Sequence, residues 1–166
     1  MKWLLCISIL CFSANAAAVR IRAQRIEGGN VVTSHGTAYI ENGKAITALH
    51  VVAEGEITIE TDIGWIAASI EKSDKDFDIA ILKPRAPVNI HQDIPKGTVI
   101  LASARSNPVV AMPAEIVGSK SANCAKFDHG CSGAPLFKDG IFIGICTHIG
   151  AGVTYVPAVL VRELLK

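Results

Sequence analysis

Three residues of this chain have the side chains of a nucleophile, a base and an acid, and each lies beside a short apolar segment. Ser132 lies within Gly-Cys-Ser-Gly-Ala-Pro at 130–135, His50 ends the run Thr-Ala-Leu-His, and Asp78 begins Asp-Ile-Ala-Ile. A serine hydroxyl is a weak nucleophile, which becomes reactive when a histidine takes its proton and a third group orients that histidine. The three segments therefore predict Ser132 as nucleophile, His50 as general base and Asp78 as the acid that orients it.

The order of these residues along the chain separates known solutions to this chemistry. In α/β-hydrolases the order is serine, acid, histidine, and in subtilisins it is acid, histidine, serine. The order here is histidine, aspartate, serine, and together with the Thr-Ala-x-His and Gly-x-Ser-Gly motifs it resembles the chymotrypsin-like (trypsin-like) serine peptidases of compact bacterial or viral size. The resemblance implies a serine endopeptidase that cleaves protein or peptide substrates through an acyl-enzyme intermediate and needs no cofactor.

The resemblance also assigns the groups around the nucleophile. In that family the backbone N–H groups of the serine and of the residue two before it form the oxyanion hole, which implies Ser132 and Gly130. The residue six before the serine lines the pocket for the substrate side chain, and here it is Lys126 rather than an aspartate. The segment 144–148, which holds Thr147 and His148, should lie alongside the substrate. Lys126 or His148 would favour an acidic or glutamine side chain in the substrate; in the alternative, both point to solvent.

Other titratable residues compete for these roles. Asp76 is the fallback for Asp78, and the alternative for the whole acidic segment is a solvated loop. The remaining histidines lie in polar segments or lack the context of a strand end; they are His35, His91, His129 and His148.

The sequence departs from the trypsin-type peptidases at the residues needed for zymogen activation. The segment 25–29 faintly resembles the activation site of trypsin-type zymogens, but the residue before the serine is Cys131, which cannot form the required ion pair. We therefore expect no such switch, and Gly28-Gly29 predicts a turn.

The cysteines and histidines do not have metal-binding spacing. Cys6 and Cys11 lie in the N-terminal segment, and Cys124, Cys131 and Cys146 lie in the rest of the chain. One disulfide with one free thiol, or three buried free thiols, are both compatible with this odd number. The chain contains neither Cys-x-x-Cys nor His-x-x-x-His, so we expect no metal site.

The N-terminus has the features of a signal peptide. Lys2 precedes an apolar run at 3–12, and Ala14-Asn15-Ala16 offers small residues for cleavage after Ala16. We therefore expect residues 1–16 to be a signal peptide and the protein to be secreted or periplasmic, without stable membrane association after cleavage; an uncleaved anchor is the alternative. The formal net charge of +1 gives no reason to expect a nucleic-acid partner.

The rest of the chain predicts an all-β fold. Short Ile-, Val- and Thr-rich runs alternate with turn signals, among them Asn42-Gly43 and Asp139-Gly140. The runs expected to be strands are 36–40, 45–49, 56–61, 64–72, 79–82, 98–102, 109–112, 114–119, 135–137, 141–146 and 152–156, and a helix is expected at 157–166. Half of the residues are apolar, which suffices for a core. The pattern suits two packed, six-stranded β-barrels of chymotrypsin-like type with a short C-terminal helix.

This layout places the three residues in different halves of one peptidase domain at 17–166. His50 and Asp78 fall in the half at 17–90, and Ser132 falls in the half at 91–166, so the site should lie in the cleft between them. Two alternative functions remain open from sequence. One is a catalytically inactive, peptidase-fold binding protein in the periplasm or extracellular space, and the other is a processing enzyme dedicated to one substrate.

Overall fold

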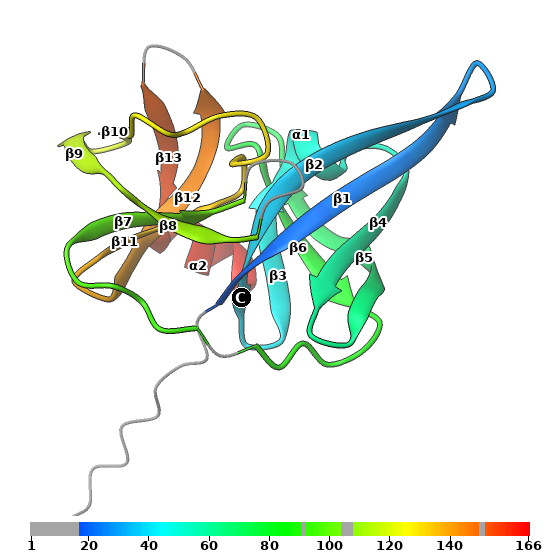
Figure 1. Ribbon diagram of the computed structural model, residues 1–166, viewed down its shortest axis with the longest axis horizontal. Helices are drawn as coiled ribbons and strands as arrows, with labels where there is room; N and C mark the ends of the chain where they lie inside the picture. Colours follow the sequence, from blue (N-terminus) through cyan, green and yellow to red (C-terminus); the bar gives the residue numbers. More distant parts are fainter. Residues whose placement is uncertain (1–16, 91, 104–107, 150–151) are drawn as a thin grey trace, which may run out of the picture.

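We describe the protein from a computed structural model, in which residues 17–90, 92–103, 108–149 and 152–166 are described. The expected signal peptide at 1–16, with its cleavage site, and the competing histidine His91 lie outside the described residues. The described chain forms two β-sheets and a short C-terminal helix (Figure 1). The prediction of an all-β fold with two barrel-like sheets and a terminal helix is confirmed, and the arrangement is consistent with a chymotrypsin-like fold.

The first sheet closes on itself as a barrel with the strand order β1-β2-β3-β6-β5-β4. Its elements are β1 (Ala17–Glu27), β2 (Asn30–Glu41), β3 (Lys44–Ala48), α1 (Leu49–Val52), β4 (Glu56–Thr61), β5 (Gly64–Asp74) and β6 (Ile79–Pro84). All neighbouring strands are antiparallel. Small and β-branched side chains fill the barrel, because alternate residues of each strand point inward.

The second sheet has seven strands rather than the six expected, in the order β8-β7-β11-β12-β13-β10-β9. Its elements are β7 (Thr98–Ala102), β8 (Val110–Pro113), β9 (Glu115–Gly118), β10 (Ser121–Asn123), β11 (Pro135–Lys138), β12 (Ile141–Ile149) and β13 (Val153–Pro157), followed by α2 (Ala158–Leu165). The additional strand is β10, which has only three residues and no run of β-branched side chains.

The predicted turns have the backbone conformation that their residues favour. Asn42 and Gly43, and likewise Asp139 and Gly140, have positive φ angles, which Asn, Asp and Gly adopt at low cost. Gly28-Gly29 forms the expected turn, but the strands that it connects are longer than predicted. β1 was not expected from sequence, and β2 begins six residues before the expected start at Gly36.

The two sheets pack against each other through an aromatic cluster. Tyr39 of β2 stacks on Phe142 with ring centroids 4.3 Å apart, and it meets Phe137 edge-on at 5.9 Å. Val161 of α2 is buried in the same cluster, together with Ile79 of the first barrel. Residues of both sheets and of the helix therefore share one core, which fixes the first barrel against the second sheet. Neither described helix is long and apolar enough to cross a bilayer.

Candidate functional site

Strand pairing in the first barrel brings His50 beside Asp78. The last residue of β3, Ala48, is opposite the first residue of β6, Ile79. In an antiparallel pair, the residues that follow one strand lie next to those that precede the other. The Leu49 N–H accordingly donates to the Asp78 carbonyl oxygen at 2.8 Å, and His50 follows in the single turn of α1.

Asp78 contacts His50 at two points. Its Oδ1 accepts a hydrogen bond from the His50 backbone N–H at 2.8 Å, and its Oδ2 lies 2.6 Å from His50 Nδ1. The φ angle of Asp78 is 53°, in the left-handed region that Asp and Asn tolerate better than other residues with a Cβ. This arrangement fixes the ring orientation and favours the tautomer with the proton on Nδ1, which leaves Nε2 as the basic nitrogen.

The neighbouring aspartate Asp74 has a different local role. Asp74 Oδ1 accepts the N–H groups of Asp76 and Phe77 at 2.9 and 3.1 Å and thereby closes the turn before Asp78. Among the described contacts, the carboxylate at hydrogen-bond distance from His50 is that of Asp78. The fallback residue Asp76 is not brought to His50.

The loop that holds Ser132 is fastened by backbone hydrogen bonds at both of its sides. The Gly133 N–H donates to the Cys146 carbonyl oxygen of β12 at 2.6 Å, and the Ala134 N–H donates to the Cys131 carbonyl oxygen at 3.0 Å. From the first barrel, the Thr37 N–H donates to the Ser132 carbonyl oxygen at 2.9 Å. Ser132 is therefore held by both halves of the molecule, and 8 % of its surface is exposed.

A buried threonine pair extends this link between the halves. The Thr37 hydroxyl donates to the Gly130 carbonyl oxygen at 3.1 Å and accepts the Ser103 N–H at 3.0 Å. The Thr47 hydroxyl donates to the Thr37 carbonyl oxygen at 2.7 Å. Both threonines are fully buried, where an unsatisfied hydroxyl would be costly. The Thr37 side chain thus joins three segments by hydrogen bonds: its own strand β2, Ser103 directly after β7, and the loop that holds Ser132.

Gly133 allows this close approach. A Cβ at Gly133 would overlap the Thr37 carbonyl oxygen and the Thr47 hydroxyl, and the φ angle of +86° is unfavourable for residues with a Cβ. Glycine is therefore required twice at this position, for its backbone conformation and for the space it leaves. These two requirements explain why the last residue of the Gly-x-Ser-Gly motif is a glycine.

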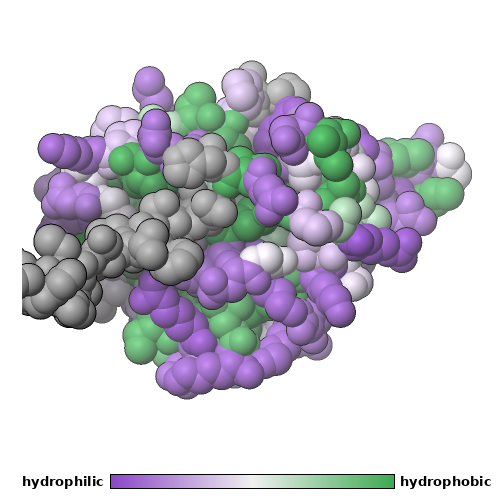
Figure 2. All heavy atoms as spheres, turned by 90° about the horizontal axis from the view of Figure 1, so that it is seen from below, coloured by the Kyte–Doolittle hydropathy of each residue, from purple (hydrophilic) through white to green (hydrophobic). Residues whose placement is uncertain are grey.

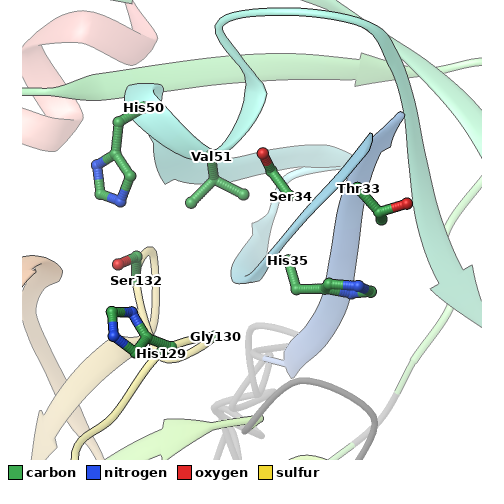
Figure 3. A pocket seen from close by; sticks show the side chains of 8 residues that line it. All are labelled: Thr33, Ser34, His35, His50, Val51, His129, Gly130 and Ser132. Atoms are coloured by element: carbon green, nitrogen blue, oxygen red, sulfur yellow. The ribbon is translucent and has the colours of Figure 1, made fainter. Parts of the chain in front are cut away.

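A cavity of about 540 Å³ lies between His50 and Ser132. Its lining residues are Thr33, Ser34, His35, His50, Val51, His129, Gly130 and Ser132. Figure 3 shows the imidazole of His50 extending toward the hydroxyl of Ser132 from the opposite wall, with His129 beside the serine. The first barrel supplies one wall and the Ser132 loop supplies the other. Sequence reasoning expected His50, Ser132 and Gly130 to meet in such a cleft, and they line one pocket.

The two backbone N–H groups expected to form the oxyanion hole have no protein acceptor among the described residues. Gly130 has a φ angle of +97°, and neither its N–H nor that of Ser132 donates within the described hydrogen bonds. A buried or half-buried N–H without a partner is uncommon unless a ligand or water satisfies it. Gly130 and Ser132 both line the pocket, so their N–H groups are the candidates for holding an oxygen atom there.

The residues expected to bind the substrate side chain are not in this pocket. Lys126 is exposed and Thr147 is buried in β12, and neither lines the cavity. His148 belongs to β12, but its side chain lies outside the described residues. Sequence reasoning missed the lining by Thr33 and Ser34, because it did not predict a strand at these positions.

The three cysteines of the described residues are free thiols. Cys131 and Cys146 are buried, and Cys124 is half-buried. Burial raises the pKa of the Cys131 thiol, and it raises that of Cys146 well above its ordinary value. These three described cysteines form no disulfide, as in the pattern of three free thiols, but Cys124 is half-buried rather than buried. The described His, Cys, Asp and Glu residues form no group suited to holding a metal ion.

Comparison with known proteins assigns no family. No family model matches the chain, and no curated protein matches it. What the pocket can do is therefore inferred from its own residues.

Proposed function

We propose that this protein is an exported serine endopeptidase of chymotrypsin-like type, with Ser132, His50 and Asp78 as its catalytic residues. The observation that carries the proposal is the contact between His50 Nδ1 and Asp78 Oδ2 at 2.6 Å, in a histidine whose ring extends across a pocket toward Ser132 (Figure 3). A base oriented by a carboxylate and facing a serine hydroxyl is the arrangement that activates serine for acyl transfer.

In the proposed reaction, Ser132 Oγ attacks the carbonyl carbon of a peptide bond while His50 Nε2 takes the hydroxyl proton. The resulting oxyanion is held by the N–H groups of Gly130 and Ser132, and donors of this kind contribute about 3 kcal/mol each to the stability of the transition state. His50 then gives its proton to the departing amine, and the acyl group remains on Ser132. A water molecule, deprotonated by His50, hydrolyses this ester and restores the serine.

Asp78 has two parts in this proposal. It holds the His50 ring in the tautomer that leaves Nε2 basic, and its negative charge stabilises the imidazolium that forms when Nε2 takes a proton. The hydrogen bond from the His50 N–H to Asp78 Oδ1 keeps the carboxylate from rotating away. The substrate preference for acidic or glutamine side chains, suggested by Lys126 and His148, remains a prediction, as does export by the N-terminal segment.

The proposal is tested by digestion of a denatured protein. The purified chain, incubated with denatured serum albumin, should release peptides that mass spectrometry identifies, and Ser132→Ala should release at least 1,000-fold less. Ser73, an exposed serine of β5 outside the pocket, provides the matched control, and Ser73→Ala should digest the albumin as the wild type does. Equal digestion by Ser132→Ala would exclude this mechanism. No digestion by the folded wild type, with retained peptide binding, would support the alternative of an inactive binding protein.

A further inference from the structure

The buried polar residues of the described chain gather around the Ser132 loop. Hydrophilic side chains otherwise cover much of the surface, as the face in Figure 2 shows. The polar residues that the described chain buries are Thr37, Thr47, Ser103, Ser132 and Thr147. Hydrogen bonds join Thr37 directly to the next three of them. Burying a polar group is costly unless it is hydrogen-bonded, so this gathering behind the nucleophile calls for a physical reason.

One peptide group stands between the two N–H donors proposed for the oxyanion hole. The donors belong to Gly130 and Ser132, and the peptide group that joins Gly130 to Cys131 lies between them along the chain. Because a peptide group is planar, only the φ and ψ angles on its two sides set the direction of one donor relative to the other. The orientation of this peptide group is therefore one determinant of whether both donors point to the same oxygen atom.

Both polar ends of that peptide group are held by hydrogen bonds. The Gly130 carbonyl oxygen accepts the Thr37 hydroxyl at 3.1 Å, and the Cys131 N–H donates to the Asp128 carbonyl oxygen at 3.0 Å. Asp128 belongs to the same loop, so its contact moves with the loop. Thr37 belongs to β2 of the first barrel and is 93 residues from Gly130 in sequence. Among the described hydrogen bonds, that of the Thr37 hydroxyl fixes this peptide group to an element outside the loop.

The Thr37 side chain is itself held in one orientation. Its hydroxyl donates to Gly130 and accepts the Ser103 N–H at 3.0 Å, which together fix the direction of the O–H bond. Its backbone N–H donates to the Ser132 carbonyl oxygen at 2.9 Å, and its carbonyl oxygen accepts the Thr47 hydroxyl at 2.7 Å. Branching at Cβ further restricts the rotation of a threonine side chain. Thr37 can therefore transmit the position of β2 to the Ser132 loop.

Close packing at Gly36, the residue before Thr37, places β2 at a fixed distance from the site. A Cβ at Gly36 would lie 2.9 Å from the Ser132 carbonyl oxygen and 2.7 Å from Val51 Cγ1 of α1, closer than atoms pack in proteins. β2 thus lies in contact with both the Ser132 loop and the helix that carries His50. A side chain on β2 is well placed to hold the loop in register with the base.

We propose that Thr37 is a positioning residue for the oxyanion hole: its hydroxyl orients the peptide group after Gly130 so that the Gly130 and Ser132 N–H groups point to one oxygen atom in the pocket. This inference rests on the proposed function. Thr37 is fully buried and does not line the pocket, so it acts through Gly130 and does not touch the substrate. Preorganised donors stabilise the charge that develops in the transition state, so their misplacement lowers kcat rather than raising KM.

Substitutions at Thr37 test this inference on a peptide taken from the digest of denatured serum albumin. Thr37→Val and Thr37→Ala remove the hydroxyl, whereas Thr37→Ser keeps it. In folded Thr37→Val, kcat should fall by about 30- to 100-fold, somewhat less than the roughly 10²–10³-fold cost of removing one donor outright. KM should change by less than about 3-fold. Thr37→Ser should keep kcat within 5-fold of the wild type, and Thr37→Ala carries the same expectation as Thr37→Val if the latter does not fold.

A pair of inhibitors gives a second readout that stability alone does not move. A peptide aldehyde forms an adduct with Ser132 that places an oxygen atom in the oxyanion hole, and the corresponding peptide alcohol forms no adduct. The inhibition constant of the aldehyde should rise at least 10-fold in Thr37→Val, while that of the alcohol should change by less than 3-fold. Ile59 provides the control, because it is fully buried in β4 and does not line the pocket. Ile59→Val should lose stability but keep kcat within 2-fold of the wild type.

The outcomes separate this inference from the proposed function. A wild-type kcat in folded Thr37→Val, or a loss that appears equally in KM and in the alcohol constant, would overturn the inference and leave the proposed function standing. Failure of both Thr37→Val and Thr37→Ala to fold would assign the hydroxyl to stability alone and would also overturn it. Absence of cleavage by the wild type would end the proposed function and the inference with it.

Discussion

Asp78 holds His50 by its backbone and by its ring: Oδ1 accepts the His50 N–H at 2.8 Å, and Oδ2 lies 2.6 Å from Nδ1. The two contacts come from one carboxylate on a residue with a φ angle of 53°. The carboxylate therefore fixes both the position of the first turn of α1 and the rotation of the imidazole. In the proposed mechanism, this is the contact that leaves Nε2 free to serve as the base.

Replacing the Asp78 carboxylate by an amide removes its charge and its control of the His50 tautomer while keeping the backbone geometry. Asn also tolerates positive φ, so Asp78→Asn should fold with a melting temperature close to that of the wild type. Its kcat should fall by about 10⁴-fold, the cost of a wrong tautomer in triads of this kind. The measurement is kcat on a cleaved peptide, together with thermal unfolding. A kcat within 10-fold of the wild type would remove Asp78 from the mechanism, and Asp76→Asn is the control expected to retain activity.

The buried hydroxyl of Thr37 should stabilise the Ser132 loop. Thr37→Val keeps the shape of the side chain but removes one donor to Gly130 and one acceptor for Ser103. Leaving buried polar groups unpaired costs about 1–3 kcal/mol each, so we expect a clear fall in the free energy of unfolding. Thr37→Ser retains the hydroxyl and should lose less than half as much. Denaturant unfolding of the three proteins checks this, and equal stability of Thr37→Val and the wild type would contradict it.

Alanine substitutions at Gly133 and Gly140 distinguish the cost of overpacking from the cost of an unfavourable φ angle. Both have positive φ angles, +86° and +80°, but a Cβ at Gly133 meets Thr37 and Thr47, whereas one at Gly140 meets open space. We expect Gly140→Ala to cost about 1–2 kcal/mol from φ alone. Gly133→Ala should cost about 1–3 kcal/mol more, because overpacking adds to the same strain. Similar losses in the free energy of unfolding for the two variants, measured by thermal and denaturant unfolding, would show that the Ser132 loop moves aside for the added Cβ without cost.

The buried thiols should resist alkylation in the folded protein. Cys131 is 1 % and Cys146 is 0 % exposed, and burial raises the pKa of both. Because the thiolate is the reactive form, both should stay unmodified by iodoacetamide at a pH near 8, and denaturant should make all three cysteines reactive. Peptide mapping by mass spectrometry after each treatment gives the answer. Native modification of Cys146, or a disulfide between any two of the three, would contradict the observed packing.

Local sequence signals were sufficient to predict the turns, but the positions of the candidate site residues depend on pairing between strands that are far apart in sequence. Asn42-Gly43 and Asp139-Gly140 could be recognised because their residues favour positive φ. The neighbourhood of His50 and Asp78 depends on the register between Ala48 and Ile79, which a motif alone does not specify. The reading of His50, Asp78 and Ser132 as a set came from motif order. The two contacts between His50 and Asp78, which are 28 residues apart in sequence, came from the pairing of β3 with β6. The pocket that His50 shares with Ser132 came from the packing of the two halves of the molecule.

The missed elements have physical reasons. β1 alternates buried Val19, Ile21 and Ala23 with arginine and glutamine, and its polar residues obscured a strand whose inner face is mostly small. The outer arginines are satisfied across the barrel: Arg22 donates to the Thr58 hydroxyl at 3.0 Å and lies 4.2 Å from the Trp65 ring centroid. These partners lie far from β1 in sequence, so no local pattern near β1 predicts them.

The central claim is that Ser132 is an activated nucleophile, and a fluorophosphonate probe tests it directly. Intact mass spectrometry of the folded protein should show one adduct per chain, mapped to Ser132 by peptide sequencing. The adduct should be absent in Ser132→Ala and at least 100-fold slower to form in His50→Ala, while Ser73→Ala should label as the wild type does. No adduct on wild-type protein whose circular dichroism shows the folded β-structure, or an adduct on another residue, would contradict the account.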